Sequence, residues 1–171
     1  MKQALYISVM LGLVPFQVTV LNYAGIAGIR PDLPLVAAFL IGFLSGEMEG
    51  LLMGVILGCM QDLFSAGSVW INLITKGAIG ALAALLGRHL ASATPVTVGA
   101  LLFVLSVLAG STAVMWLRVE DGFAGVLDII QAVVVPEALF DAALGAAIYW
   151  ILPGRRRRAA EFGDDMALFG R

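Results

Sequence analysis

The sequence has few charged residues and few residues that bind metals or form disulfides. Charged residues make up 13% of its 171 positions, and it contains one cysteine, Cys59, and one histidine, His89. An internal disulfide is therefore excluded, and Cys59, which lies in an apolar run, is interpreted as a small packing residue. His89 has no second histidine that would support a metal site or a Ser-His-Asp triad. We expect no metal, no cofactor and no catalytic residue, so the sequence does not indicate an enzyme.

Two further classes of function are excluded by what the sequence lacks. The net charge of −2 is small, and no basic stripe with interleaved aromatic residues occurs, so we expect no nucleic-acid partner. The glycines have helical spacing and form neither a phosphate-binding loop nor a dinucleotide-binding fingerprint.

Apolar residues dominate the chain. They make up 61% of it, and the mean hydropathy is +1.00, whereas soluble domains are about 45–50% apolar. A membrane-spanning helix needs about 20 apolar residues, so the chain can hold five or six spans and no separate soluble domain. We predict an all-α integral membrane protein with about six transmembrane helices in a compact bundle over residues 1–153, followed by a basic cytoplasmic tail over 154–171.

Glycine, proline and charged residues separate the predicted spans. Pro31 and Pro34 suit the first turn of a helix, where Asp32 complements the helix dipole. A single helix over 35–64 is rejected, because it would place Glu47 and Glu49 in mid-membrane at about 2.5–3.5 kcal/mol each; we expect these glutamates in a tight turn. The predicted spans cover residues 4–21, 31–45, 50–64, 70–86, 96–117 and 136–152.

Residues 123–135 form an apolar segment that could take more than one position relative to the membrane. The segment contains Asp128 and Gln131, and we expect Pro136, which follows it, to interrupt a helix. It either spans the membrane, re-enters it or lies on its surface before the last span.

The basic residues predict the orientation. With both termini in the cytoplasm, six spans place seven basic residues inside and two, Arg30 and Arg118, outside, which satisfies the positive-inside rule. The inside set is Lys2, Arg88, Arg155, Arg156, Arg157, Arg158 and Arg171. The run from Arg155 to Arg158 is expected to fix topology and to contact anionic lipid head groups.

Glycine recurs at every fourth residue in one stretch. Gly42, Gly46, Gly50, Gly54 and Gly58 would share one face of a helix and let another backbone approach closely. Each glycine costs about 1 kcal/mol against alanine inside a helix, which favours a packing role. We predict that the glycine seam, Gly46 to Gly58, contacts a helix either of the same chain or of a partner.

Three polar residues, Asp62, Asn72 and Lys76, lie on either side of one short turn. Ionisable groups inside a membrane often mark functional sites, so an ion or proton site is one interpretation. A proton relay usually needs a longer series of acidic or histidine groups. We therefore favour a structural role, in which Asp62 caps the turn or contacts water, and Lys76 either extends its charge to the membrane surface or pairs with Asp62.

Glu137 and Asp141 are one helical turn apart and would share a helix face. Carboxylates at this spacing suit acid–base chemistry or a divalent metal. Glu137 directly follows Pro136, however, and the first turn of a helix, where the dipole favours a carboxylate, explains it more simply.

Several short motifs resemble those of one family. They are Pro31-Asp32-Leu33, the run Gly54, Gly58, Gln61-Asp62-Leu63, Ser65 and Gly67, then Asn72, Lys76-Gly77 and Gly80, and Pro136 with Leu139 ahead of a basic end. With these motifs the sequence is similar to the rod shape-determining protein MreD family of bacteria. The family often has glycine where Trp70 stands and asparagine where Asp141 stands.

The resemblance implies a non-enzymatic inner-membrane scaffold of the bacterial elongation (rod) complex, which maintains cell shape and lateral-wall peptidoglycan synthesis. It implies contacts with MreC and, through the complex, with MreB, RodA and a class B penicillin-binding transpeptidase. The family is also similar in architecture to the substrate-binding subunits of energy-coupling-factor transporters. The alternative function is therefore a small-molecule-binding subunit of a membrane transporter.

Overall fold

The computed structural model describes residues 12–17, 19, 29–64, 70–90, 93–119 and 124–152. These residues form helices joined by turns, which confirms the all-α prediction. The helices are α3 (Leu33–Ser45), α4 (Glu47–Phe64), α5 (Ile71–His89), α6 (Pro95–Leu117), α7 (Val126–Ile129) and α8 (Val135–Ile151), with a π-helical turn, η2 (Ile130–Val134), between the last two. Residues 12–16, within the first predicted span, are also helical.

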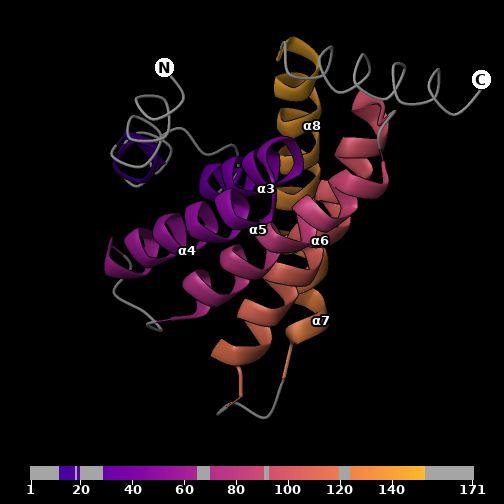
Figure 1. Ribbon diagram of the computed structural model, residues 1–171. Helices are drawn as coiled ribbons and strands as arrows, with labels where there is room; N and C mark the ends of the chain where they lie inside the picture. Colours follow the sequence, from indigo (N-terminus) through magenta and orange to yellow (C-terminus); the bar gives the residue numbers. More distant parts are fainter. Residues whose placement is uncertain are drawn as a thin grey trace, which may run out of the picture.

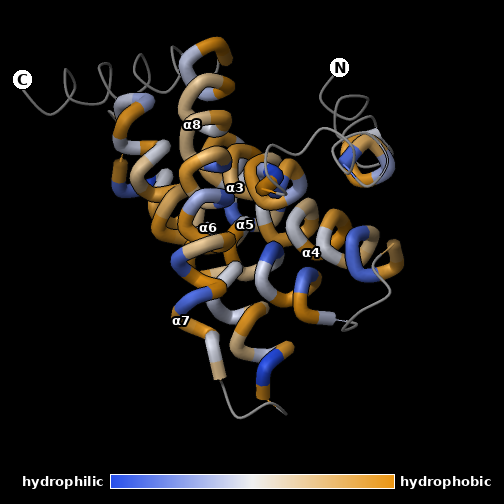
Figure 2. Tube along the Cα trace, turned by 180° about the vertical axis from the view of Figure 1, so that it is seen from behind, coloured by the Kyte–Doolittle hydropathy of each residue, from blue (hydrophilic) through white to orange (hydrophobic). Residues whose placement is uncertain are grey.

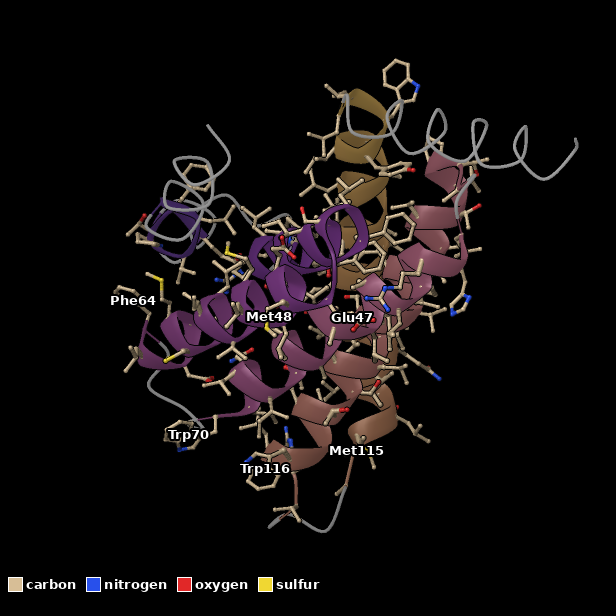
Figure 3. All side chains as sticks on the ribbon, in the orientation of Figure 1. Glu47, Met48, Phe64, Trp70, Met115 and Trp116 are labelled. Atoms are coloured by element: carbon tan, nitrogen blue, oxygen red, sulfur yellow. The ribbon has the colours of Figure 1, made fainter. Side chains whose placement is uncertain are left out.

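Three helices in the described part of the chain are long and apolar enough to cross a membrane. They are Ile71–His89, Pro95–Leu117 and the continuous helix Val126–Ile151. Large apolar side chains extend outward around the molecule, and Trp70 and Trp116 lie at the same end of it (Figure 3). An apolar exterior of this extent is typical of a surface that contacts a membrane or a partner protein.

The side chains of Asp32 and Thr94 cap the N-termini of α3 and α6. Asp32 Oδ1 accepts a hydrogen bond from the Leu35 N–H at 3.2 Å, and Thr94 Oγ1 accepts one from the Thr97 N–H at 3.2 Å. Proline follows in the first turn of each helix, where its missing N–H has no helical acceptor to leave unpaired. The second predicted span therefore begins where its proline and aspartate pattern indicates.

A single residue, Gly46, separates α3 from α4. Its φ of 129° lies in the region that favours glycine over residues with a side chain. The prediction of two helices in place of one over 35–64 is confirmed. The predicted start of the third span at Gly50 is one turn too late, because Glu47 and Glu49 lie in the first turn of α4, where the helix dipole favours them.

The helix that contains Pro136 continues through it. The Val135 N–H donates to the carbonyl of Ile130, five residues back. This wider turn accommodates the proline, which has no N–H and whose ring clashes with the carbonyl four residues before it in a regular α-helix. The predicted interruption at Pro136 is therefore wrong, and residues 126–135 belong to the same helix as the predicted last span.

The helices form two groups. In one group α3, α4 and α5 pack on one another, and in the other α6 packs on α8. Figure 1 shows the groups crossing, and contacts of α3 with α8 and of α5 with α6 join them. Apolar residues predominate along the helices, and isolated hydrophilic positions interrupt them (Figure 2).

Aromatic side chains fill part of the junction between the groups. Phe39 and Phe43 of α3 are both fully buried, and their rings stack at 5.7 Å. Tyr149 of α8 meets Phe43 edge-on at 5.9 Å, an arrangement that stabilises aromatic pairs. Buried apolar residues of α3, α5 and α6 surround these rings, and a polar part of the junction forms the site described next.

Candidate functional site

The glycine seam brings the backbone of α5 against α4. A Cβ atom added at Gly54 would meet the carbonyl oxygen of Lys76, and one added at Gly58 would meet that of Asn72. Gly50 faces the carbonyl of Gly80 in the same way. Since no side chain separates the helices at these positions, their backbones are in direct contact, as small residues allow between membrane helices.

Of the two predicted occupants of the seam, a helix of the same chain lies against it. Gly46 takes no part, because it lies in the break between α3 and α4. Gly42 of α3 adds to the seam by facing the Gly80 carbonyl. The close packing of α5 on α3 and α4 then fixes the positions of Asn72 and Lys76.

Asp62, near the end of α4, caps the start of α5. Its Oδ2 accepts hydrogen bonds from the N–H groups of Trp70 at 3.1 Å and Leu73 at 3.0 Å, and its Oδ1 accepts one from the Asn72 side-chain amide at 2.8 Å. These bonds satisfy donors that the first turn of a helix leaves without partners. They also hold Trp70 at a φ of 86°, in the left-handed region that residues with a side chain rarely adopt.

Lys76, on α5, forms an ion pair with Asp32 at the start of α3. Lys76 Nζ lies 2.7 Å from Asp32 Oδ2, and the Lys76 side chain is 2% exposed. The ammonium also donates a hydrogen bond to Asn72 Oδ1 at 2.9 Å. The predicted pairing of Lys76 with Asp62 is therefore wrong: Asn72 lies between the two charges and hydrogen-bonds both.

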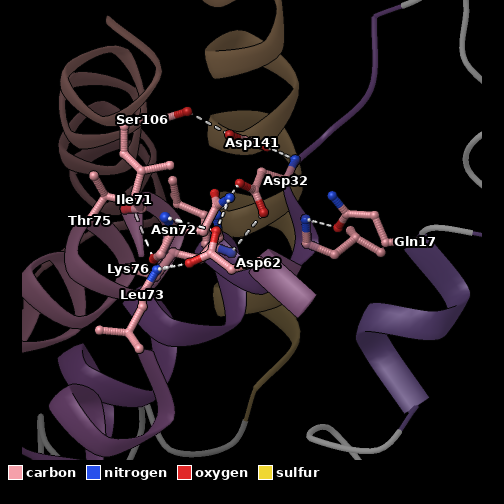
Figure 4. A network of polar contacts seen from close by, with 12 residues as sticks. Gln17, Asp32, Asp62, Ile71, Asn72, Leu73, Thr75, Lys76, Ser106 and Asp141 are labelled. Atoms are coloured by element: carbon pink, nitrogen blue, oxygen red, sulfur yellow. Dashed lines mark hydrogen bonds and ion pairs between the residues drawn. The ribbon is translucent and has the colours of Figure 1, made fainter. Parts of the chain in front are cut away.

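Asp141, on α8, connects the two groups of helices. It is 1% exposed, and its Oδ1 accepts a hydrogen bond from the Asp32 N–H at 2.7 Å. Its Oδ2 accepts one from Ser106 Oγ, on α6, at 2.6 Å. One carboxylate thus binds the start of α3 and the middle of α6, and Figure 4 shows this network.

Glu137 lies one turn before Asp141 and contacts the same incoming segment. The backbone of Arg30 donates a hydrogen bond to the Glu137 carboxylate, and the positive charge of the Arg30 side chain attracts this carboxylate. Because the continuous helix begins at Val126, Glu137 is not at a free helix N-terminus. The predicted explanation by the helix dipole is wrong, and the carboxylate instead helps to hold the chain that enters α3.

These side chains surround a cavity of about 150 Å³, which we name the polar cavity. Its walls come from the start of α3, the first half of α5, the second half of α6 and the junction of η2 with α8. The polar residues that line it are Asp32, Asn72, Thr75, Lys76, Ser106, Glu137 and Asp141.

The side chains that line the polar cavity hold the helices together through an ion pair and hydrogen bonds. Among the residues that the structure describes, no group of three histidine, cysteine, aspartate or glutamate side chains is arranged to hold a metal ion. His89 lies in the last turn of α5, whereas Ser106 lines a cavity at the first half of that helix, so these two residues do not form a catalytic pair.

No family model, curated protein or solved structure matches the chain.

Three residues of the network escaped sequence reasoning as contact residues. Asp32 was expected only at a helix start, and Ser106 and Gln17 were not singled out. Gln17 Oε1 accepts a hydrogen bond from the Leu33 N–H at 2.9 Å, which ties the first predicted span to α3. A polar side chain inside a long apolar run, as at Ser106, is the signal that would have indicated a buried contact.

Two groups of predicted residues lie elsewhere. Arg88 pairs with Glu47 at 2.9 Å at the other end of α5, where the Arg88 side chain is largely exposed and the Glu47 side chain is partly buried. Arg155, Arg156, Arg157 and Arg158, with the rest of the predicted tail, lie outside the described residues.

Proposed function

We propose that this chain is a non-enzymatic membrane scaffold of the bacterial elongation complex, of the MreD type. The observation that supports the proposal is the use of its buried charges. Asp32, Asp62, Lys76 and Asp141 all bind other parts of the same chain, so they stabilise one arrangement of helices whose outer faces are apolar. A chain of this kind acts through the surface that its helices present.

The proposed partners follow from the family resemblance. MreC, with a single membrane span, is the direct partner, and MreB, RodA and a class B penicillin-binding transpeptidase are reached through the complex. In this role the chain would help to maintain rod shape and lateral-wall peptidoglycan synthesis without carrying out a reaction itself.

The proposed topology has six spans in the bacterial inner membrane with both termini in the cytoplasm. It is supported by the distribution of basic residues, and also by the position of the polar cavity. The starts of α3 and α5 and the end of α6 would all lie toward the outside, so the buried charges would share one membrane depth. Reporter fusions near Asp121 and after Arg171 test it, and a periplasmic carboxy terminus contradicts it.

Complementation tests the proposed function. The chain is expressed in a rod-shaped bacterium that lacks its own MreD-family protein, and cell width and length are measured with the amount of membrane-inserted protein. Recovery of rods that scales with protein level is expected. Spherical cells at a normal protein level would count against the scaffold role.

The polar cavity favours one alternative function, a small-molecule-binding subunit of a transporter. A cavity of about 150 Å³ lined by charged groups has room for a small polar ligand. Native mass spectrometry of the purified chain separates the two functions. A bound small molecule at a constant ratio, lost in the Asp141→Asn variant, would support the transporter subunit.

A further inference from the structure

The polar cavity has an excess of negative charge. Three carboxylates line it, from Asp32, Glu137 and Asp141, against the single ammonium group of Lys76. Lys76 pairs with Asp32, and Arg30 acts on Glu137 from the segment before α3. Among these five groups Asp141 has no matching cation, because its two oxygens accept hydrogen bonds from a backbone N–H and from a hydroxyl, which are neutral donors.

The polar cavity adjoins an apolar groove on the outside of the protein. This groove, of about 160 Å³, runs between α5 and α6, and we name it the α5–α6 groove. Thr75 and Ala109 line both the groove and the polar cavity, so the two share part of one wall. Ala78 and Thr112 also line the groove, and such small side chains allow a second helix to approach closely.

Lipid alone is a poor cover for this surface. Acyl chains can fill the apolar groove, but they supply no donor or charge to a carboxylate beside them. A helix lying in the groove could supply both, since a lysine or arginine reaches sideways along its aliphatic stem and places its charge at the end.

We infer that the α5–α6 groove binds a transmembrane helix of a partner protein, and that a basic side chain of this helix enters the polar cavity beside Asp141. The inference rests on the proposed scaffold function and specifies its partner surface. The partner needs a basic residue because its charge must complement the Asp141 carboxylate. It needs to be a helix because the small residues of the groove allow a helix to pack closely.

Two synthetic membrane-spanning peptides test the inference in lipid nanodiscs. Both are leucine–alanine helices, one with a lysine in the half that lies beside Trp70 and one with norleucine at the same place. A photo-reactive amino acid replaces Leu108, which lines the groove and is 58% exposed, or Leu139 of α8 as a control, which is 57% exposed. The yield of cross-linked peptide is measured with the full-length protein.

The lysine peptide is expected to cross-link from position 108 at least fivefold more than the norleucine peptide, with no such difference from position 139. Asp141→Asn should remove the preference. Because that variant removes a buried contact, Ala109→Leu is tested as well: it fills the groove, leaves every charge in place and should lower the yield with both peptides.

Equal yields for the two peptides, or equal preference at position 139, would overturn the inference. Adducts with lipid or with a second copy of the chain in place of the peptide would also overturn it. The peptide measurement does not depend on cell shape. Selective binding of the lysine peptide, together with failed complementation, would therefore reject the scaffold role and keep the docking surface.

Discussion

Lys76 Nζ lies 2.7 Å from Asp32 Oδ2, and this ion pair connects the start of α3 with the first half of α5. Its two members differ in burial: the Lys76 side chain is 2% exposed and that of Asp32 is 27% exposed. The difference decides how each is expected to respond when the other is removed.

Removing Asp32 should destabilise the protein more than removing Lys76. Asp32→Asn retains an acceptor that can cap α3 but leaves the buried Lys76 charge without its partner, a change that typically costs about 3–5 kcal/mol. Lys76→Met leaves Asp32 with some access to water, so a smaller loss is expected, and the double variant should recover much of the loss. Denaturant titration of the purified protein measures these differences. Asp128→Asn, at an exposed position on α7, is the control, and a double variant less stable than either single variant would contradict the pairing.

Asp62 should behave differently, because it caps a helix and does not pair with Lys76. Asp62→Ala removes the acceptor for the Trp70 and Leu73 N–H groups, and loss of a cap typically costs about 0.5–2 kcal/mol. Adding Lys76→Met to this variant should not restore stability. The same titration detects the difference, and recovery in the Asp62→Ala/Lys76→Met variant would show that these two residues are coupled after all.

The glycine seam should not tolerate a methyl group. Gly54→Ala would place Cβ against the Lys76 carbonyl, and overpacking of this kind typically costs about 1–3 kcal/mol, and more where backbone must move. Gly12→Ala is the matched control, because a Cβ there meets nothing within 4 Å and alanine favours a helix. Thermal unfolding and the fraction of monodisperse protein are measured. Equal stability of the two variants would mean that α4 and α5 are not in backbone contact.

The π-helical turn before Pro136 holds one residue more than a regular helical turn and lets the helix pass the proline. Deleting Ala132 removes this extra residue, so a regular α-helix can form and α7 should keep its face. Val126, which is buried, should stay protected. A cysteine at position 126, in a Cys59→Ser background, is expected to remain unreactive toward a maleimide in the deletion variant. Labelling of this cysteine would show that α7 rotates when the π-helical turn is removed.

Local chemistry made much of the fold predictable from sequence. The helix break near Gly46 follows from two glutamates that a mid-membrane helix would not accommodate, and the start of α3 follows from Asp32 and the prolines. The π-helical turn was not predictable, because the sequence shows that Pro136 disturbs a helix but not whether the helix stops or widens.

The site was only partly predictable, since its contacts join distant residues. Asp62, Asn72 and Lys76 are close in sequence and were expected together. Asp32 and Asp141 are 109 positions apart, and no local pattern indicates that the backbone of one meets the side chain of the other. The charge on Lys76 predicted a partner, but the fold alone decides which of several carboxylates it is.

In the proposed scaffold the buried charges stabilise the fold and do not bind a transported ligand. Rod shape and membrane-inserted protein level, measured together for the Asp32→Asn/Lys76→Met variant in the complementation strain, distinguish these two roles. We predict that rods form in proportion to the protein that accumulates, because only the fold depends on the pair. A variant that accumulates at the wild-type level and still leaves the cells spherical would contradict the stabilising role and indicate that the pair has a binding role.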